Sequence, residues 1–469
     1  MSKSGSKIGA ALAEALGADR VAEDAPTLDA HRLDYWFLAH LRAFQGRGGA
    51  GPVCVVTPRS TDEVATTVRL AQRHGVAIVP FGGGSGVLGG SVPPDGTIVV
   101  DLRAMDRLLA LDETALFARV QGGMMGGVYE ETITARGYTT GHYPQSIARA
   151  TMGGLVATRS AGQFSTKYGN IEDLLLGLEV VLPSGNVVRL DPFPRASTGP
   201  ALQELFLGSE GALGIITEVT VKVFPLPEKR EVASFAFKSM ADGLEAIRRI
   251  IRPGWRPAVV RLYDQIESSR HFSAQNVPAD ANMLLVVCEG PAALAAVEMQ
   301  ACRDVAQAMG AGEMGPAPVE HWFGKRNEVP SWDFFLQNGL VVDTIEVAAT
   351  WDRVSGLYEA VVATLQQVPG ILAGTAHSSH SYLNGTNLYI TFAIRPDDYA
   401  QAEKLYLEAW GRVMEATIAA GGTIAHHHGI GKLRVPWLER ELKSAYPLLQ
   451  AVKRALDPAG IMNPGTLVR

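Results

Sequence analysis

The chain has 469 residues, of which 47% are hydrophobic and 19% are charged, and its formal net charge is −6. This length and composition predict a folded protein with two or three domains and exclude a disordered chain. The acidic balance and the lack of a long basic patch argue against nucleic acid as a partner. Cys54, Cys288 and Cys302 lie far apart without CxxC spacing, so we expect neither a disulfide framework nor a zinc ribbon.

The N-terminal segment, residues 1–50, is expected to be helical at first and then to form a loop. Its start, "MSKSGSKIGAALAEALGADR", is amphipathic and lacks the pattern of a secretory leader. No run of about 18 apolar residues occurs in the chain, so a membrane span is not expected and a cytoplasmic location is. We interpret the amphipathic stretch as packing on the protein, with peripheral membrane contact as the alternative.

Residues 51–225 show an α/β pattern. "PVCVVTP" reads as a buried strand, and the stretch from Ser60 to Gly75 reads as a helix. Ser60 and Glu63 form a capping box at its start, and Gly75 ends it. "VAIVPF", "TIVVDL" and "ITEVTVKVF" read as strands, and "LEVVLPSGNVVRL" as a hairpin. The cluster Pro225-Leu226-Pro227 breaks the pattern, which indicates a domain boundary there.

Residues 226–420 have a different pattern. Strands such as "VASFAF", "MLLVVCEG" and "NLYITFAI" alternate with long amphipathic helices, for example "ALAAVEMQACRDVAQAMG". This order predicts an α+β domain built on an antiparallel sheet. Residues 421–469 are expected to be a C-terminal segment, whose tail "LLQAVKRALDPAGIMNPGTL" reads as a helix, a turn and a short extended end.

Three glycine-rich loops lie next to predicted strands. The first, "GGGSGVLGG" at 82–90, follows a strand; the second lies at 151–185; the third, "LGSEGALGIITEV", lies at 207–219. Glycine allows backbone N–H groups to approach a phosphate closely, whereas a flexible surface loop is the plain alternative. The first loop is not a Walker A motif, because no Gly-Lys-Ser/Thr follows. Three such loops in order favour a nucleotide held between strands.

The order "PFGGGSG", "HYPQSIARATMGG" and "GSEGALGIITEV" resembles the vanillyl-alcohol oxidase/p-cresol methylhydroxylase superfamily of FAD enzymes. The resemblance implies an α+β fold: a two-subdomain FAD-binding domain at 51–225, a substrate-binding cap domain with an antiparallel sheet at 226–420, and a segment at 421–469 that returns to the flavin. FAD is the implied cofactor, held covalently or noncovalently, and a homodimer is the implied assembly.

Carried over residue by residue, the resemblance assigns FAD contacts to three stretches. These contacts are Pro80, Phe81, Gly82, Gly83, Gly84, Ser85, Gly86, Gln145, Ser146, Thr151, Gly153, Gly154, Thr158, Ser160, Ala161, Gly162, Glu210, Gly211, Leu213, Gly214 and Ile216.

No metal site is expected. The flavin dehydrogenases of D-2-hydroxy acids carry two histidines and a glutamate that bind a divalent metal. In this chain, "SYLNGTNLY" places Tyr382 and Tyr389 where the histidines would be, and His427 stands where the glutamate would be. Neutral phenols are poor ligands for divalent metals. A zinc site from the adjacent His426, His427 and His428 is also disfavoured, because neighbours in an extended segment point apart, with His426 and His428 on one face.

The stretch "IAHHHGIGKLR" at 424–434 resembles the alkyldihydroxyacetone-phosphate synthases of ether-lipid biosynthesis. In that family the flavin N5 forms an adduct and an acyl ester is exchanged for an alkyl ether without net redox chemistry. The resemblance assigns catalysis to Tyr389, His426, His427, His428 and Arg261. A dehydrogenase or oxidase of a hydroxy acid or alcohol, with hydride transfer to flavin N5, is the alternative. A nonenzymatic flavin- or lipid-binding protein is a third.

One position departs from the synthase pattern. The segment "VPSWDF" places Trp332 where those enzymes have an arginine for the substrate head group, and an indole cannot pair with a phosphate. Lys325 and Arg326 could compensate, or the substrate could lack a phosphate. His377 and His380 are interpreted as surface or cavity-lining residues. In the histidine stretch itself, Lys432 and Arg434 are interpreted as a solvated pair, with a role in the site as the alternative.

Overall fold

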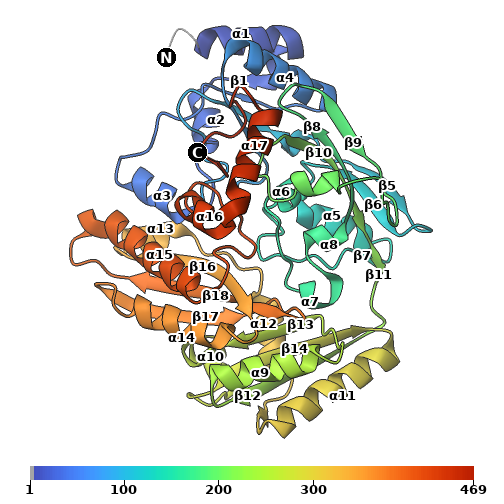
Figure 1. Ribbon diagram of the computed structural model, residues 1–469, viewed down its shortest axis with the longest axis vertical. Coiled ribbons are helices and arrows are strands. Elements are labelled where there is room, and N and C mark those ends of the chain that lie inside the picture. The colour runs from blue at the N-terminus through green and yellow to red at the C-terminus, as the bar shows by residue number, and fades with distance from the viewer. Residues whose placement is uncertain (1–4, 469) are drawn as a thin grey trace.

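The computed structural model describes residues 5–468 and contains three main sheets (Figure 1). The first has the strand order β1 (Val21–Ala22), β2 (Cys54–Val56), β4 (Ile98–Asp101), β3 (Ile78–Phe81). Strands β2, β4 and β3 are parallel, as the crossover helix α4 (Thr61–His74) requires. The predicted cap is present: Ser60 Oγ accepts from the Glu63 N–H, and Gly75 ends the helix in the left-handed region.

The second sheet is antiparallel and packs against short helices. Its order is β5 (Leu108–Asp112), β6 (Phe117–Gln121), β10 (Ile215–Lys222), β8 (Leu175–Val181), β9 (Val187–Leu190). The helices between its strands are α5 (Gly126–Thr134), α6 (Met152–Ala157), α7 (Ser165–Tyr168) and α8 (Ile171–Leu174). Strands β7 (Tyr138–Thr139) and β11 (Phe224–Pro225) pair separately. The predicted hairpin is therefore observed as β8–β9.

The third sheet has seven strands, and all its pairs are antiparallel. Its order is β15 (Gly312–Glu313), β12 (Lys229–Phe237), β14 (Asn282–Gly290), β13 (Val259–Tyr263), β17 (Ile371–Ser378), β18 (Gly385–Ile394), β16 (Val341–Thr350). Its helices are α9 (Met240–Ile251), α10 (Gln265–Phe272), α11 (Ala292–Ala308), α12 (Ala317–Lys325), α13 (Trp332–Gln337), α14 (Val354–Leu365) and α15 (Ala402–Ala419). Every residue of β14 is buried, so both faces of this central strand are covered.

The two ends of the chain pack onto the sheets. At the start lie α1 (Gly5–Leu16), α2 (Ala25–Ala30) and α3 (Phe37–Phe44), and at the end lie α16 (Val435–Leu442) and α17 (Tyr446–Leu456). Short 3-10 turns occupy Ala18–Arg20, Leu102–Ala104, Leu202–Leu205, Ser273–Gln275, Tyr399–Gln401 and Lys443–Ala445. Residues 5–50 are more ordered than the expected helix and loop, because β1 pairs with β2 and α3 packs on α13 and α15. Over residues 5–468, no helix has both the length and the apolarity to cross a membrane.

Candidate functional site

A cavity of about 1030 Å³ lies between the glycine-rich loops and the seven-stranded sheet. One side is formed by the loop after β3, the start of α6 and the residues before β10. The other side is formed by β13, β16, β17 and β18. The stretch around His427 and His428 closes it from the C-terminal segment. This volume matches the upper end of the range for cavities that hold a cofactor or a drug-sized ligand.

The first glycine loop leaves no room for side chains. A Cβ on Gly83 would lie 1.4 Å from the Arg149 carbonyl oxygen, and one on Gly82 would lie 2.3 Å from Thr151 Oγ1. Gly84 and Gly211 have φ angles of 61° and 76°, in the left-handed region. Glycine is therefore required for the close packing of this loop, and the half-buried backbone of Gly82 to Gly86 borders the cavity as a wall. The wall fits a group such as a nucleotide pyrophosphate.

The predicted cofactor contacts lie along this wall, with two exceptions. All line the cavity apart from Gly162 and Leu213. Gly162 lies behind the wall, since a Cβ there would be 3.0 Å from His142 Nδ1. Glu210 lines the cavity, but its carboxylate accepts hydrogen bonds from the Ile430 and Gly431 N–H groups, at 2.7 and 3.0 Å. It therefore also holds the C-terminal segment against the third glycine loop.

A buried histidine lies behind the second glycine stretch. His142 Nε2 is 2.9 Å from Ser160 Oγ, and Ser160 lines the cavity. Burial lowers the pKa of His142 to about 4, so the ring is neutral near pH 7. The ring thus fixes the orientation of the Ser160 hydroxyl without placing a charge in the wall.

Tyr389 lies on β18 and lines the cavity. Its hydroxyl donates to Thr344 Oγ1 on the neighbouring β16, at 3.0 Å. Its ring stacks on His377, with centroids 4.8 Å apart and planes 18° apart. Burial raises the pKa of Tyr389 to about 12, so it is a neutral proton donor near pH 7.

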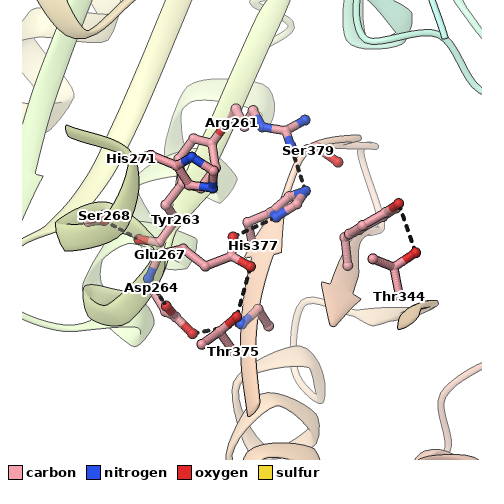
Figure 2. Close-up of polar contacts among 12 residues, drawn as sticks. Arg261, Tyr263, Asp264, Glu267, Ser268, His271, Thr344, Thr375, His377 and Ser379 are labelled. Carbon is pink, nitrogen blue, oxygen red and sulfur yellow. Dashed lines mark hydrogen bonds and ion pairs between the residues drawn. The ribbon is translucent and has the colours of Figure 1, made fainter. Parts of the chain in front are cut away.

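Arg261 is held by a network that extends from β13 to β17 (Figure 2). Its Nη2 lies 2.7 Å from His377 Nε2, and its Nε donates to the Tyr263 hydroxyl at 2.6 Å. His377 Nδ1 lies 2.8 Å from Glu267 Oε2. A guanidinium has no acceptor, so His377 Nε2 must accept and Nδ1–H must donate to Glu267. His377 is therefore neutral, in agreement with burial lowering its pKa to about 4.

The histidine stretch is fixed by Glu346 on β16. Glu346 Oε1 accepts from the His428 N–H at 2.9 Å, and its Oε2 lies 2.7 Å from His428 Nδ1. Arg434 donates to both oxygens, at 2.6 and 2.8 Å, and both partners are fully buried. The prediction that Lys432 and Arg434 form a solvated pair is wrong. Lys432 is half-buried and donates to the Val92 carbonyl oxygen.

The three histidines do not alternate between two faces, because they lie in a loop with bends and not in a strand. His427 and His428 both line the cavity, whereas His426 lies outside it. His426 Nε2 is 2.7 Å from the hydroxyl of Tyr382. The phenol at the expected position of a metal-binding histidine is thus a hydrogen-bond partner of the histidine stretch. Within residues 5–468, no group of three or more His, Cys, Asp or Glu side chains is arranged to hold a metal ion.

Several cavity residues were not singled out from the sequence. Glu267 and Tyr263 line the cavity, and the i, i+2 spacing of Arg261 and Tyr263 on one strand face was the available signal. His377 and His380 are both buried cavity residues, which fits one of the two roles considered for them. Glu267 could not be assigned beforehand, because its contact with His377 joins residues 110 positions apart.

Trp332 lines the cavity, and its indole N–H donates to the Tyr35 carbonyl oxygen at 3.0 Å. Lys325 is exposed and paired with Glu328 at 2.7 Å. Arg326 lines the cavity, donates to Gln163 at 2.8 Å and lies 5.2 Å from the ring centre of Tyr143. The position of the expected arginine is therefore occupied by a side chain with a structural partner.

Residues 52–191 match the family described as "FAD binding domain", and residues 226–467 match "FAD linked oxidases, C-terminal domain". The second match spans more than half of the chain, so the protein belongs to the FAD-linked oxidases. These matches confirm three predictions: the protein binds FAD, it is an enzyme, and it belongs to the predicted superfamily.

Two relatives cover nearly the whole chain. YgcU of Escherichia coli K12, described as an uncharacterized FAD-linked oxidoreductase, is 36% identical over 97% of each chain. The alkyldihydroxyacetonephosphate synthase of Trypanosoma brucei brucei is 31% identical over 97% of this chain and 80% of that protein.

Solved structures agree with the predicted fold. A structure of alkyldihydroxyacetonephosphate synthase covers 98% of this chain, and this chain covers 84% of it, with a TM-score of 0.81 and 28% identity. One of p-cresol methylhydroxylase covers 100% of this chain and is itself covered over 97%, with a TM-score of 0.79. At 18% identity, this second likeness concerns the fold alone. The predicted α+β fold, with its p-cresol methylhydroxylase type of FAD-binding domain, is confirmed.

Proposed function

We propose that this enzyme exchanges the acyl ester of a small ketone-type substrate for an alkyl ether, with FAD as its cofactor and without net redox chemistry. The observation that carries the proposal is the grouping of Tyr389, His427 and His428 on one cavity wall, opposite the glycine cradle. The similarity of 97% of this chain to the synthase of Trypanosoma brucei brucei supports the same chemistry. In this proposal, residues 51–225 hold FAD, residues 226–420 cover the substrate and residues 421–469 complete the site.

The glycine loop at 80–86 and Glu210–Ile216 would hold the FAD pyrophosphate and flavin edge, because their backbone is open to the cavity. Bound FAD supplies an electrophilic ring to which a substrate carbon can pass an electron pair. The remaining work is proton transfer and substrate positioning, which fall to this chain's side chains.

The acid and base roles follow from protonation. Tyr389 is neutral and can donate a proton to a departing oxygen. Burial lowers the pKa of His427 well below the usual range for histidine, so His427 is neutral and can accept a proton from the substrate. His428 is held by Glu346, which fixes the ring at the wall. Arg261, oriented by His377 and Tyr263, would hold an anionic or carbonyl oxygen of the substrate.

A second candidate function is oxidation of an alcohol or hydroxy acid. Trp332 favours it, because the arginine expected for a phosphate head group is absent and the indole already has a partner in Tyr35. The relative named as an oxidoreductase fits this reading as well. In that reaction the neutral His427 would take the hydroxyl proton, and bound FAD would supply the hydride acceptor.

Anaerobic mixing distinguishes the two functions. In the first case, the holoenzyme should convert an acyl ester of dihydroxyacetone, with or without its phosphate, and a long-chain alcohol into an ether and a free carboxylate. The visible flavin spectrum should return to its oxidised form without an added electron acceptor. In the second case, an alcohol or hydroxy acid alone should bleach the flavin permanently. Bleaching without exchange would reject the first function.

A substitution at Trp332 tests whether the missing arginine sets the preference for a substrate without a phosphate. Trp332→Arg restores the residue of the synthases at this position. If the natural substrate lacks a phosphate, the variant should gain activity with the phosphorylated ester relative to the unphosphorylated one. Phe335→Arg is a matched control, since Phe335 lies on the same helix, outside the cavity-lining set.

A further inference from the structure

A chain of hydrogen bonds leads out of the cavity through the histidine stretch. His427 Nδ1 lies 2.7 Å from His426 Nδ1. His426 Nε2 lies 2.7 Å from the Tyr382 hydroxyl, which also accepts from Asn170 Nδ2 at 2.9 Å. Three adjacent groups are thus linked without a gap, although Tyr382 is 44 positions away from His426 in sequence.

The two ends of this chain lie in different surroundings. At the inner end, the His427 ring lines the cavity, and its Nε2 makes no hydrogen bond to any residue between 5 and 468. At the outer end, Tyr382 is half-buried in the turn between β17 and β18, and the next residue, Leu383, is 72% exposed. The half-buried carboxylate of Glu172 is near enough to raise the pKa of Tyr382. The chain therefore runs from the cavity to a half-buried tyrosine beside an exposed turn.

All three linked groups are neutral near pH 7. Burial lowers the pKa of His426 to about 4 and that of His427 well below its usual range, while burial raises the pKa of Tyr382. His380 covers both rings, with ring centres 5.2 Å from His426 and 5.0 Å from His427. Neutral groups in a dry contact can pass a proton in sequence without leaving a buried charge at rest.

The contact between the two Nδ1 atoms has a strict consequence. A neutral imidazole has one donor nitrogen and one acceptor nitrogen. One of the two Nδ1 atoms must therefore carry the shared proton, and the other must accept it. The two rings are then opposite tautomers, one protonated at Nδ1 and the other at Nε2.

We infer that His427, His426 and Tyr382 form a proton relay that carries a substrate hydroxyl proton from the cavity to the protein surface. The inference rests on the proposed function only in that a hydroxyl loses a proton. Both candidate reactions meet this condition, because an alcohol that becomes an ether and an alcohol that is oxidised each release one hydroxyl proton.

The transfer balances at each step. The substrate O–H bond breaks and a proton bonds to His427 Nε2, while the His427 Nδ1 proton moves to His426 Nδ1. The His426 Nε2 proton moves to the Tyr382 oxygen, and the Tyr382 hydroxyl proton leaves to water. Each relay group gains one proton and loses one, so no charge remains inside. After the transfer, the donor and acceptor of each hydrogen bond in the chain are exchanged. The original direction returns when the hydroxyl and the rings exchange protons with water.

Histidine tautomers in the resting holoenzyme test the relay without any substrate. Nitrogen-15 NMR of ¹⁵N-histidine-labelled protein, assigned with His426→Gln and His427→Gln, should show two neutral rings with opposite tautomers. Two rings protonated only at Nε2, or a charged ring at pH 7, would overturn the inference. The result is independent of the reaction catalysed, so failure here and failure of the proposed function are distinguishable.

Steady-state kinetics provide a second test of the proton relay. Tyr382→Phe keeps the ring and removes the hydroxyl, so kcat with the ester and alcohol should fall by about 10-fold in dilute buffer, with KM unchanged. Imidazole added as a free proton carrier should restore the variant and leave the wild type unaffected, which a structural defect would not show. Tyr138→Phe is the matched control, because Tyr138 contacts Glu113 away from the cavity. Wild-type kcat for Tyr382→Phe in dilute buffer would overturn the relay.

Discussion

Arg434 and Glu346 form a fully buried, two-bond ion pair, at 2.6 and 2.8 Å, directly behind the histidine stretch. Glu346 also accepts from the His428 backbone N–H, so the same carboxylate fixes both the cation and the loop. The pair thus determines where His427 and His428 lie relative to Tyr389. Such a pair matters for position more than for net stability, because desolvation offsets much of its attraction.

Glu346→Gln should destabilise the protein by about 3–5 kcal/mol, because Arg434 would remain buried without a counter-charge. Chemical denaturation of the holoenzyme measures this change. Glu408→Gln is the control: Glu408 pairs with Arg412 at 2.8 Å on a partly exposed helix face, and its loss should cost less than about 0.5 kcal/mol. Equal effects for the two variants would contradict the role assigned to the buried pair.

Gly83→Ala should abolish or strongly weaken FAD binding. Its Cβ would lie 1.4 Å from the Arg149 carbonyl oxygen, so the loop backbone must move away from its present path. Flavin absorbance per mole of purified protein gives the readout, together with FAD titration of the apoprotein. Gly312→Ala is the control, since nothing lies within 4 Å of a Cβ there. Full flavin content in Gly83→Ala would show that this loop does not form the cofactor wall.

Tyr389→Phe should lower kcat by about 10²–10⁴-fold while leaving FAD binding intact. The ring and its stacking on His377 are kept, and only the hydroxyl that contacts Thr344 is lost. Steady-state kinetics beside the flavin spectrum separate these effects, and Thr344→Val tests whether the partner hydroxyl is needed too. Unchanged kcat would remove Tyr389 from the proposed mechanism.

His142→Gln should give a stability difference that depends on pH. The pKa of His142 is lowered to about 4 in the fold, against about 6.5 in the unfolded chain. As pH falls from 6.5 to 4, only the unfolded chain takes up this proton, so the wild type loses up to about 3 kcal/mol at this position. The variant lacks this loss, and its deficit relative to wild type should therefore shrink across the window. Urea unfolding at pH 7.5 and pH 4.5 measures it, and a constant deficit would contradict a neutral His142.

Local patterns were enough to predict much of the fold. The ends of α4 are predicted by Ser60, Glu63 and Gly75, and the β8–β9 hairpin is predicted by the turn residues at 183–186. The resemblance added the cofactor and the class of enzyme, which glycine content alone left open. Comparison of "SYLNGTNLY" and of the histidine stretch with related sequences singled out Tyr382 and His426, which are in contact in the structure.

Contacts between distant segments could not be predicted. Arg434 looks like an exposed cation beside Lys432, and only Glu346, 88 positions earlier, makes it a buried partner. The Glu267–His377 contact likewise joins residues that are far apart in the sequence. The orientation of the three histidines depends on these contacts, since a loop without regular backbone has no fixed alternation of faces. Sequence periodicity therefore gave the wrong arrangement for His426 and His428.

Anaerobic incubation of the purified holoenzyme tests the proposed ester-for-ether exchange most directly. The reaction uses an acyl ester of dihydroxyacetone, with and without phosphate, and an ¹⁸O-labelled long-chain alcohol. We expect an ether that retains the label, one carboxylate released per ether, and flavin that ends oxidised with no electron acceptor present. A flavin left reduced by the alcohol alone, with no labelled ether, would contradict the exchange reaction and assign the site to oxidation.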